Sequence, residues 1–186
     1  MQDWVPVPGS ARRRLLDAAL EVFERDGFEA AGVVDIATTA GVTTGSLYHH
    51  FGSKLGLFTV IRREMERRVR DRFEGAAAVA GGGRQGVAVA LLVGFDAAVR
   101  FKAARILSDD PPEVDESTLR ATLGSTLRST LAQLAAPAAD ATAAVLLGAW
   151  RSALSEAARG DPATARAGRA WALGVDAGGS QPAPRT

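Results

Sequence analysis

The stretch that decides the fold runs from Val33 to Phe58 and reads VVDIATTAGVTTGSLYHHFGSKLGLF. On both sides of Gly41, apolar residues recur three and four positions apart. This spacing predicts two short helices, one over 33–40 and one that starts at Thr43 and ends before Gly52. Because the two helices meet at Gly41 and Val42, the connection between them is a turn of about three or four residues, the length found in helix-turn-helix motifs.

The apolar positions of this stretch form one inner face. We expect it to pack against Leu20 and Phe23 of a preceding helix, and its members are Ile36, Ala37, Ala40, Val42, Leu47 and Phe51. Packing on this side fixes the crossing angle of the two helices and turns the opposite side of the second helix outward. In a helix-turn-helix motif, that outward side can enter the major groove of duplex DNA.

The outward side of the second helix carries short hydroxyl groups, a glycine and two ring side chains: Thr43, Thr44, Gly45, Ser46, Tyr48 and His49. Such groups can donate to phosphate oxygens or to base edges, and a glycine lets the backbone approach closely. Lys54 lies in the first turn of the next helix, where free backbone N–H groups and the helix dipole favour an anion. These seven residues are the candidate DNA-binding residues.

Several motifs of this region together resemble the DNA-binding signature of TetR-type transcriptional regulators. They are Asp35-Ile36-Ala37, Ala40-Gly41-Val42, the run from Gly45 to Phe51, and Ser53-Lys54, and the resemblance covers about residues 10–58. It implies a homodimer whose two recognition helices read adjacent major grooves of a near-palindromic operator, with C-terminal helices forming a ligand pocket and a dimer interface. It also implies that Thr43, Tyr48, His49 and Lys54 anchor phosphates, and that Thr44, Gly45 and Ser46 read base edges.

The chain departs from the family pattern at four positions. Gly32 stands where the second helix usually begins with a threonine or serine, which weakens the helix cap by a few tenths of a kcal/mol. Thr44 replaces a basic residue that is frequent in the recognition helix, and Leu55 and Gly56 replace polar residues that favour a helix. These departures bear on the operator sequence and on the affinity for it, neither of which the resemblance specifies.

The rest of the chain also shows helical spacing, so the predicted fold class is all-α. Ser10 is the expected cap of a first helix, which Gly27 ends in the left-handed conformation while Phe28 folds back over Phe23. A fourth helix is predicted from Ser53 past Phe73, with Phe58, Ile61, Met65, Val69 and Phe73 on one face. The expected domains are a three-helix DNA-binding domain over 10–58, a connecting helix over 59–74, and a helical ligand-binding and dimerisation domain over 75–175.

Glycines between 75 and 86 suggest a flexible boundary between the two domains. Beyond it, helices are predicted over 85–107, 117–134, 138–158 and 162–175, and residues 176–186 form a tail that is expected to be disordered. Small residues at close intervals on the last two helices predict a four-helix dimer interface, and they are Ala144, Gly148, Ser152, Ala165, Gly168 and Ala172.

Composition excludes several kinds of site. The 186 residues contain no cysteine and two histidines, so disulfides and thiolate metal sites are excluded, and a cofactor or metal centre is not expected. The two histidines, His49 and His50, are adjacent on the predicted recognition helix, which leaves no residues for a catalytic triad, and no enzyme activity is predicted. No apolar run is long enough to span a membrane, and neither a secretory signal nor membrane association is expected, which fits a cytoplasmic protein.

Ligand-binding candidates in the C-terminal half are weaker, since aromatic residues at helical spacing usually form core. They are Phe95, Asp96, Phe101, Thr126 and Trp150. The resulting hypothesis is a dimeric transcriptional regulator, foremost a repressor that an unknown small-molecule effector releases from DNA. A ligand-independent regulator or an activator is the main alternative. A helical protein-interaction module is the other, because acidic and basic residues balance over residues 1–74 and Thr44 carries no charge.

Overall fold

The computed structural model describes residues 9–81, 83–109, 121, 125 and 136–160, and the regular elements within them are helices. They are α1 (Ala11–Ala30), α2 (Val33–Thr39), α3 (Thr44–Phe51), α4 (Lys54–Val79), α5 (Gly83–Arg100), α6 (Ala104–Ser108) and α8 (Ala136–Arg159). The predicted all-α class is confirmed. The N-terminal arm, the helices predicted over 117–134 and 162–175, and the C-terminal tail lie mostly or wholly outside the described residues. Within the described part of the chain, no helix combines the length and apolarity needed to cross a membrane.

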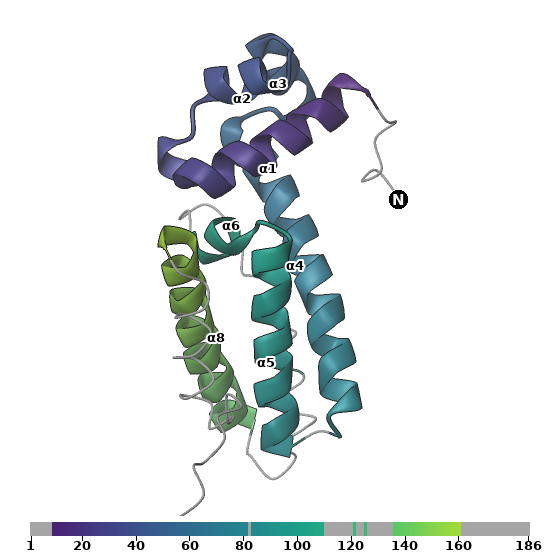
Figure 1. The fold of residues 1–186 in the computed structure, drawn as a ribbon, viewed down its shortest axis with the longest axis vertical. Helices are drawn as coiled ribbons and strands as arrows, with labels where there is room; N and C mark the ends of the chain where they lie inside the picture. The colour runs from purple at the N-terminus through teal and green to yellow at the C-terminus, as the bar shows by residue number, and fades with distance from the viewer. Residues whose placement is uncertain (1–8, 82, 110–120, 122–124, 126–135, 161–186) are drawn as a thin grey trace, which may run out of the picture.

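Helices α1, α2 and α3 pack together at one end of the molecule, and we call them the helix-turn-helix unit (Figure 1). Helix α4 leaves this unit and runs alongside α5, while α8 lies on the other side of α5. Short helix α6 crosses between the end of α1 and the top of α8. The C-terminal helices therefore meet the helix-turn-helix unit at two places, through α4 and through α6.

Helix α1 begins and bends where the sequence indicates. The Ser10 hydroxyl oxygen accepts a hydrogen bond from the Arg13 N–H at 3.2 Å, which makes Ser10 the cap. Gly27 has φ +83°, but its ψ of 170° lies outside the predicted left-handed region, in a conformation open almost only to glycine. The chain turns a corner there and makes one further helical turn to Ala30. The expected contact of Phe28 with Phe23 is present, with ring centroids 6.2 Å apart.

The predicted flexible boundary is largely helical. Helix α4 continues through Gly75 to Val79, and α5 already begins at Gly83. Ala76 and Ala77, which follow Gly75, pack on the core beside α5. Burial against a neighbouring helix therefore outweighs the low helix propensity of the glycines.

The single helix predicted over 85–107 is wrong. Helix α5 ends at Arg100, Lys102 takes φ +52°, and α6 begins at Ala104 in a new direction. The sequence between them contains no proline or glycine, so a local signal for the break is missing. The break depends on contacts with α1, which are described below.

Helix α4 carries its predicted apolar face, and Phe58, Ile61, Met65, Val69 and Phe73 are all buried. It also carries buried charges that are paired within the helix. Arg62 and Glu66 form an ion pair at 3.1 Å with both side chains buried. Burial opposes ionisation of Glu64, but hydrogen bonds from Arg67 and Arg68 outweigh it and lower the pKa of Glu64 below its usual value.

Gly56, in the first turn of α4, is required by a close approach. A Cβ atom at this position would overlap the carbonyl oxygen of Phe51, the last residue of α3. We predict that Gly56→Ala lowers the free energy of unfolding by about 1–3 kcal/mol, because the α3–α4 corner must shift. Gly75→Ala is the matched control on the same helix, since a Cβ there meets no atom within 4 Å. The control should stabilise by about 0.5–1 kcal/mol. Chemical denaturation measures both changes, and equal effects would contradict the close approach.

Candidate nucleic-acid interface

The turn between α2 and α3 is closed by backbone hydrogen bonds. Gly41 takes φ +62°, and its N–H donates to the Thr38 carbonyl at 3.0 Å, while the Val42 N–H donates to the Ala37 carbonyl at 3.0 Å. Helix α3 then begins at its cap Thr43, whose hydroxyl oxygen accepts from the Ser46 N–H at 3.3 Å. At the other end, Gly52 has φ +75° and lets the chain leave α3. The hydrogen bonds of the turn thus fix α3 relative to α2, and Gly41 permits the positive φ angle that the turn requires.

The predicted inner face is buried. Ile36, Ala37, Ala40 and Leu47 belong to the core, and Val42 and Phe51 pack against it. Gly32 caps α2 as predicted, and it has no side chain to accept a hydrogen bond. Because this side of α3 is committed to the core, its other side faces outward.

The outward side of α3 carries the predicted polar groups. Thr43, Gly45 and His49 are exposed, Thr44 and Ser46 are partly buried, and 52% of Tyr48 is accessible to solvent. The rings of His49 and His50 lie 5.1 Å apart, edge to face. Among the described residues, no three histidine, aspartate or glutamate side chains gather as a metal site would need. The surface of α3 is thus made of hydrogen-bonding groups without a cluster of charge.

Lys54 stands at the start of α4 as predicted, but its side chain points to the end of α1. The ammonium donates to the carbonyl oxygens of Phe28 at 2.8 Å, Glu29 at 3.3 Å and Ala31 at 3.1 Å, and it lies 4.6 Å from the centre of the Phe28 ring. A lysine has three N–H donors, and here three carbonyls take them. Lys54 therefore ties the end of α1 to the start of α4, a role that the sequence analysis missed. Its predicted contact with a phosphate stays a prediction.

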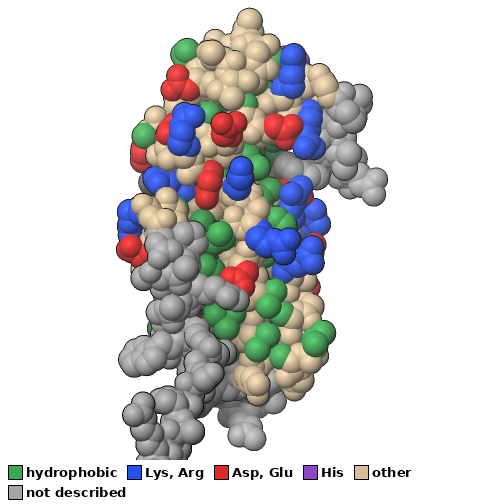
Figure 2. All heavy atoms as spheres, viewed as in Figure 1, with side chains coloured by type: hydrophobic (Ala, Val, Ile, Leu, Met, Phe, Trp, Pro, Cys, Tyr) green, Lys and Arg blue, Asp and Glu red, His purple; other side chains and the backbone are tan. Residues whose placement is uncertain are grey.

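Two basic residues near the start of α1 have different partners, one on α3 and one within α1. The Arg12 guanidinium lies 5.4 Å from the centre of the Phe51 ring, and Arg13 pairs with Asp17 at 2.8 Å. Figure 2 shows basic and acidic side chains interspersed on the visible face over α1 and α4. On that face, charge is mixed, which agrees with the balance counted from the sequence.

The ligand-binding candidates lie mainly in the core of the C-terminal helices. Phe95 and Trp150 are buried, and the Trp150 indole N–H donates to the Leu91 carbonyl at 3.1 Å, which joins α8 to α5. Asp96 and Phe101 are partly buried, and Thr126 lies outside the described residues. Packing thus accounts for Phe95 and Trp150 without a ligand.

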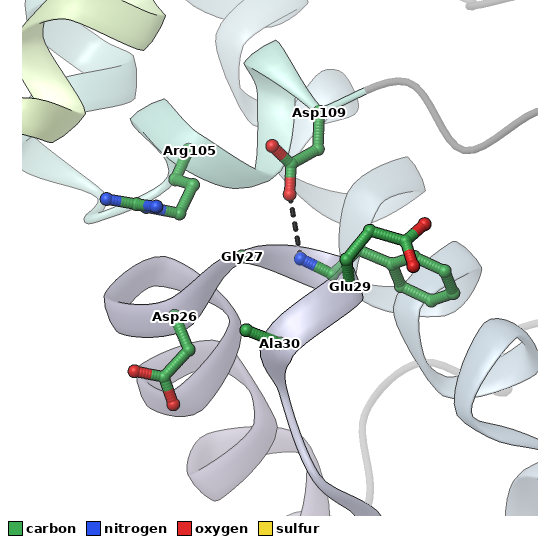
Figure 3. Close-up of a pocket in the computed structure, with 7 residues that line it drawn as sticks. Asp26, Gly27, Glu29, Ala30, Arg105 and Asp109 are labelled. Carbon is green, nitrogen blue, oxygen red and sulfur yellow. Dashed lines mark hydrogen bonds between the residues drawn. The ribbon is translucent and has the colours of Figure 1, made fainter.

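A pocket of about 280 Å³ lies elsewhere, where the last turn of α1 meets α6 (Figure 3). It is lined by Asp26, Gly27, Phe28, Glu29, Ala30, Arg105 and Asp109. Of the ligand-binding candidates that the structure describes, Phe95, Asp96, Phe101 and Trp150 are not among the lining residues.

Comparison with known proteins finds relatives of the N-terminal part of the chain. Residues 15–61 match the family model for bacterial regulatory proteins of the tetR family. The regulator UidR of Escherichia coli K12 is 40% identical over 62 residues, which are 33% of this chain and 32% of UidR. The regulator BetI of E. coli O139:H28 is 40% identical over 60 residues, 32% of this chain and 31% of BetI. The match thus spans about a third of the length of these relatives.

Solved structures share the fold over nearly the whole chain. A TetR-family regulator from Pectobacterium atrosepticum has a TM-score of 0.64 at 22% identity, covering 91% of this chain and 95% of that one. A transcriptional regulator from Rhodococcus sp. has a TM-score of 0.66 at 22% identity, and the alignment covers 89% of this chain and 95% of that one. FadR of Bacillus subtilis, solved in complex with stearoyl-CoA, has a TM-score of 0.63 at 17% identity, and the alignment covers 87% of this chain and 97% of that one.

Helices α2 and α3, joined by a short turn with their inner faces buried and the polar side of α3 exposed, have the arrangement of a helix-turn-helix motif. The match over residues 15–61 lies on this motif and on the helices that support it. Residues 15–61 therefore carry a helix-turn-helix domain similar to that of the tetR family, and the described residues that follow it are helical.

The position of the Lys54 ammonium yields a test of stability. We predict that Lys54→Met lowers the free energy of unfolding by about 1–3 kcal/mol, because three carbonyls at the end of α1 lose a charged donor. Arg63→Met is the control, since Arg63 is an exposed cation on the same helix. Urea denaturation compares the two variants. A Lys54 variant as stable as the Arg63 variant would show that the ammonium adds nothing to the fold.

Proposed function

We propose that the protein is a sequence-specific, DNA-binding transcriptional regulator that acts as a homodimer in the cytoplasm, foremost as a repressor. The observation that carries this proposal is the exposed polar side of α3, whose opposite side packs on the buried inner faces of α1 and α2 in a domain of the TetR type. Relatives named as transcriptional regulators share this domain. The operator is a near-palindromic duplex that takes one recognition helix in each half-site.

The roles of the α3 residues follow from their exposure and chemistry. Thr43, Tyr48 and His49 are exposed donors suited to phosphate oxygens. Thr44, Gly45 and Ser46 form the first turn of α3, which faces base edges when a recognition helix enters the major groove. The Thr43 hydroxyl accepts from within α3, so its own proton is available to a phosphate.

Lys54 is assigned a phosphate contact by resemblance to the family. The Lys54→Met variant tests this second role when DNA binding is measured over a range of salt concentrations. A phosphate contact predicts that the salt slope falls by about one. An unchanged slope together with lost stability would restrict Lys54 to its place at the end of α1.

The dimer is proposed to form through α8. Its outward side exposes small and apolar residues, among them Val145, of which 71% is accessible, with Gly148, Ala149 and Ser152. Small side chains let two helices approach closely about a two-fold axis, which matches the symmetry of a palindromic site. The second small-residue helix predicted for this interface lies outside the described residues.

Release from DNA is proposed to follow binding of a small molecule in the C-terminal part. The structural neighbour FadR holds stearoyl-CoA, which supports a ligand site in this fold. Helix α4 belongs to both parts of the chain, so a ligand that favours another tilt of α4 would change the distance between recognition helices. The two helices must lie about 34 Å apart to fit one turn of DNA.

Selection of bound fragments from random duplex DNA tests the proposed function directly. The purified full-length protein should enrich an inverted repeat whose half-sites are one helical turn apart. Absence of enrichment at low salt would favour a protein-interaction module on the same scaffold. The enriched sequence then serves as the operator in the experiments below.

Tyr48 should contribute to operator binding through its hydroxyl group. We predict that Tyr48→Phe costs about 1 kcal/mol of binding free energy, the value of one hydrogen bond, and leaves the melting temperature unchanged because the ring is half exposed. Fluorescence anisotropy with the selected operator measures the loss. A lower melting temperature with unchanged affinity would instead make Tyr48 a packing residue.

The α8 face should be sensitive to charge if two copies meet there. We predict that Val145→Lys raises the dimer dissociation constant about tenfold or more, since the two-fold axis brings two ammonium groups together. Val79→Lys is the matched control, because Val79 is also an exposed valine, at the far end of α4. Analytical ultracentrifugation distinguishes the outcomes, and equal behaviour of both variants would place the interface elsewhere.

A further inference from the structure

Helix α6 is five residues long, and the N–H groups of its first turn have no carbonyl partners within the helix. The side chain of Glu24, on α1, supplies acceptors for them. One carboxylate oxygen accepts from the Ala104 N–H at 3.0 Å, and the other accepts from Arg105 at 2.9 Å and Ile106 at 3.4 Å. A residue some eighty positions away in sequence thus caps α6.

A second hydrogen bond between a carboxylate and a backbone N–H also joins α1 to α6, but here the N–H is on α1 and the carboxylate follows α6. The Asp109 carboxylate, just after α6, accepts from the Phe28 N–H at 2.8 Å, as the dashed line in Figure 3 shows. The corner at Gly27 exposes this N–H to α6, and a Cβ at Gly27 would lie 3.3 Å from the same Asp109 oxygen. We call these two contacts, Glu24 with α6 and Asp109 with Phe28, the α1–α6 latch.

The α6 side of the latch is fixed to the C-terminal helices. The Asp109 carbonyl accepts from Arg62 of α4 at 2.5 Å and from Arg151 of α8 at 3.0 Å. Arg105 of α6 donates to the Ala158 carbonyl at 3.3 Å, near the end of α8. A displacement of α4 or α8 would therefore pull on α6, and through the latch on α1.

Joining two helices through a carboxylate costs free energy, because the charged group is partly removed from water. Desolvation raises the pKa of Glu24 above its usual value, and the hydrogen bonds from Ile106, Arg105 and Ala104 offset only part of that effect. An apolar side chain would not remove a charge from water, but it would leave the three N–H groups at the start of α6 without an acceptor. What the carboxylate adds is direction, since its two oxygens meet three N–H groups in one orientation of α1.

We propose that Glu24 and Asp109 are positioning residues for DNA binding, which set the orientation of the helix-turn-helix unit on the C-terminal part and thereby the operator half-site spacing that the dimer accepts. This inference rests on the proposed function. Without the latch, α4 is the main link to the helix-turn-helix unit, and the unit can pivot about the start of α4. With the latch, two links hold it, and the distance between the two α3 helices of the dimer is narrowly defined.

The experiment compares full-length wild type with Glu24→Ala, Glu24→Gln and the control Glu21→Ala. Glu21 is an exposed glutamate one turn earlier on the same helix. Each protein is titrated with the selected operator, with operators whose half-sites are moved by one or two base pairs, and with a single half-site. Amide hydrogen exchange at residues 104–106 reports on the latch without DNA.

Glu24→Ala should bind the single half-site within about twofold of wild type, because α3 itself is unchanged. Its preference for the selected spacing over the shifted ones should fall about fivefold or more, and exchange at 104–106 should be faster. Glu24→Gln, which keeps one carbonyl acceptor, should lie between wild type and Glu24→Ala. Glu21→Ala should match wild type in every measurement.

Three results would overturn the proposal: an unchanged spacing preference despite faster exchange, unchanged exchange at 104–106, or equal loss of affinity for every duplex. The last result would mean that Glu24 only stabilises the fold. If Glu24→Ala does not fold, Glu24→Gln with Asp109→Asn carries the same comparison. Failure of the proposed function is separate, since the wild type would then enrich no inverted repeat.

Discussion

Three phenylalanine rings hold the helix-turn-helix unit to the rest of the molecule. Phe23 of α1, Phe28 after the corner at Gly27, and Phe58 of α4 are in mutual contact, with centroid distances of 4.9 to 6.2 Å. Phe23 meets Phe58 edge to face, the arrangement that ring quadrupoles favour. The Lys54 ammonium lies over the Phe28 ring and donates to the carbonyl oxygens beside it. The start of α4, and with it the end of α3, takes its position from this cluster.

Local patterns predicted the helix-turn-helix unit well. The bounds of α2 and α3, which were predicted to within one residue, and the inner apolar face depend on residues close in sequence, where helical period and turn chemistry are informative. The Gly27 and Phe28 corner was also visible, although its ψ angle was not, because that angle serves a contact with Asp109.

Long-range contacts explain what the sequence did not reveal. Lys54 meets carbonyls more than twenty positions away, and Glu24 meets amides about eighty positions away, so neither pairing leaves a local pattern. The break before α6 has the same origin, since a five-residue helix with its first N–H groups capped from α1 needs no proline or glycine to define it. The glycines between 75 and 86 predicted a flexible boundary, but residues 75–79 are helical because they pack against α5. The functional assignment of the α3 residues drew on resemblance, because their exposure alone is common to many helices.

The junction at α6 has a consequence for protein engineering. A DNA-reading module cut out at the start of α4 would lose some of the hydrogen bonds that its own residues make. In this protein, two groups of α1 bind residues of the other half of the chain. The Glu24 carboxylate accepts from backbone N–H groups of α6, and the Phe28 N–H donates to the Asp109 carboxylate. A chimaera that joins this module to the C-terminal helices of another regulator would leave the Glu24 carboxylate without the N–H groups that it binds. Helix α6 therefore has to be transferred together with the module.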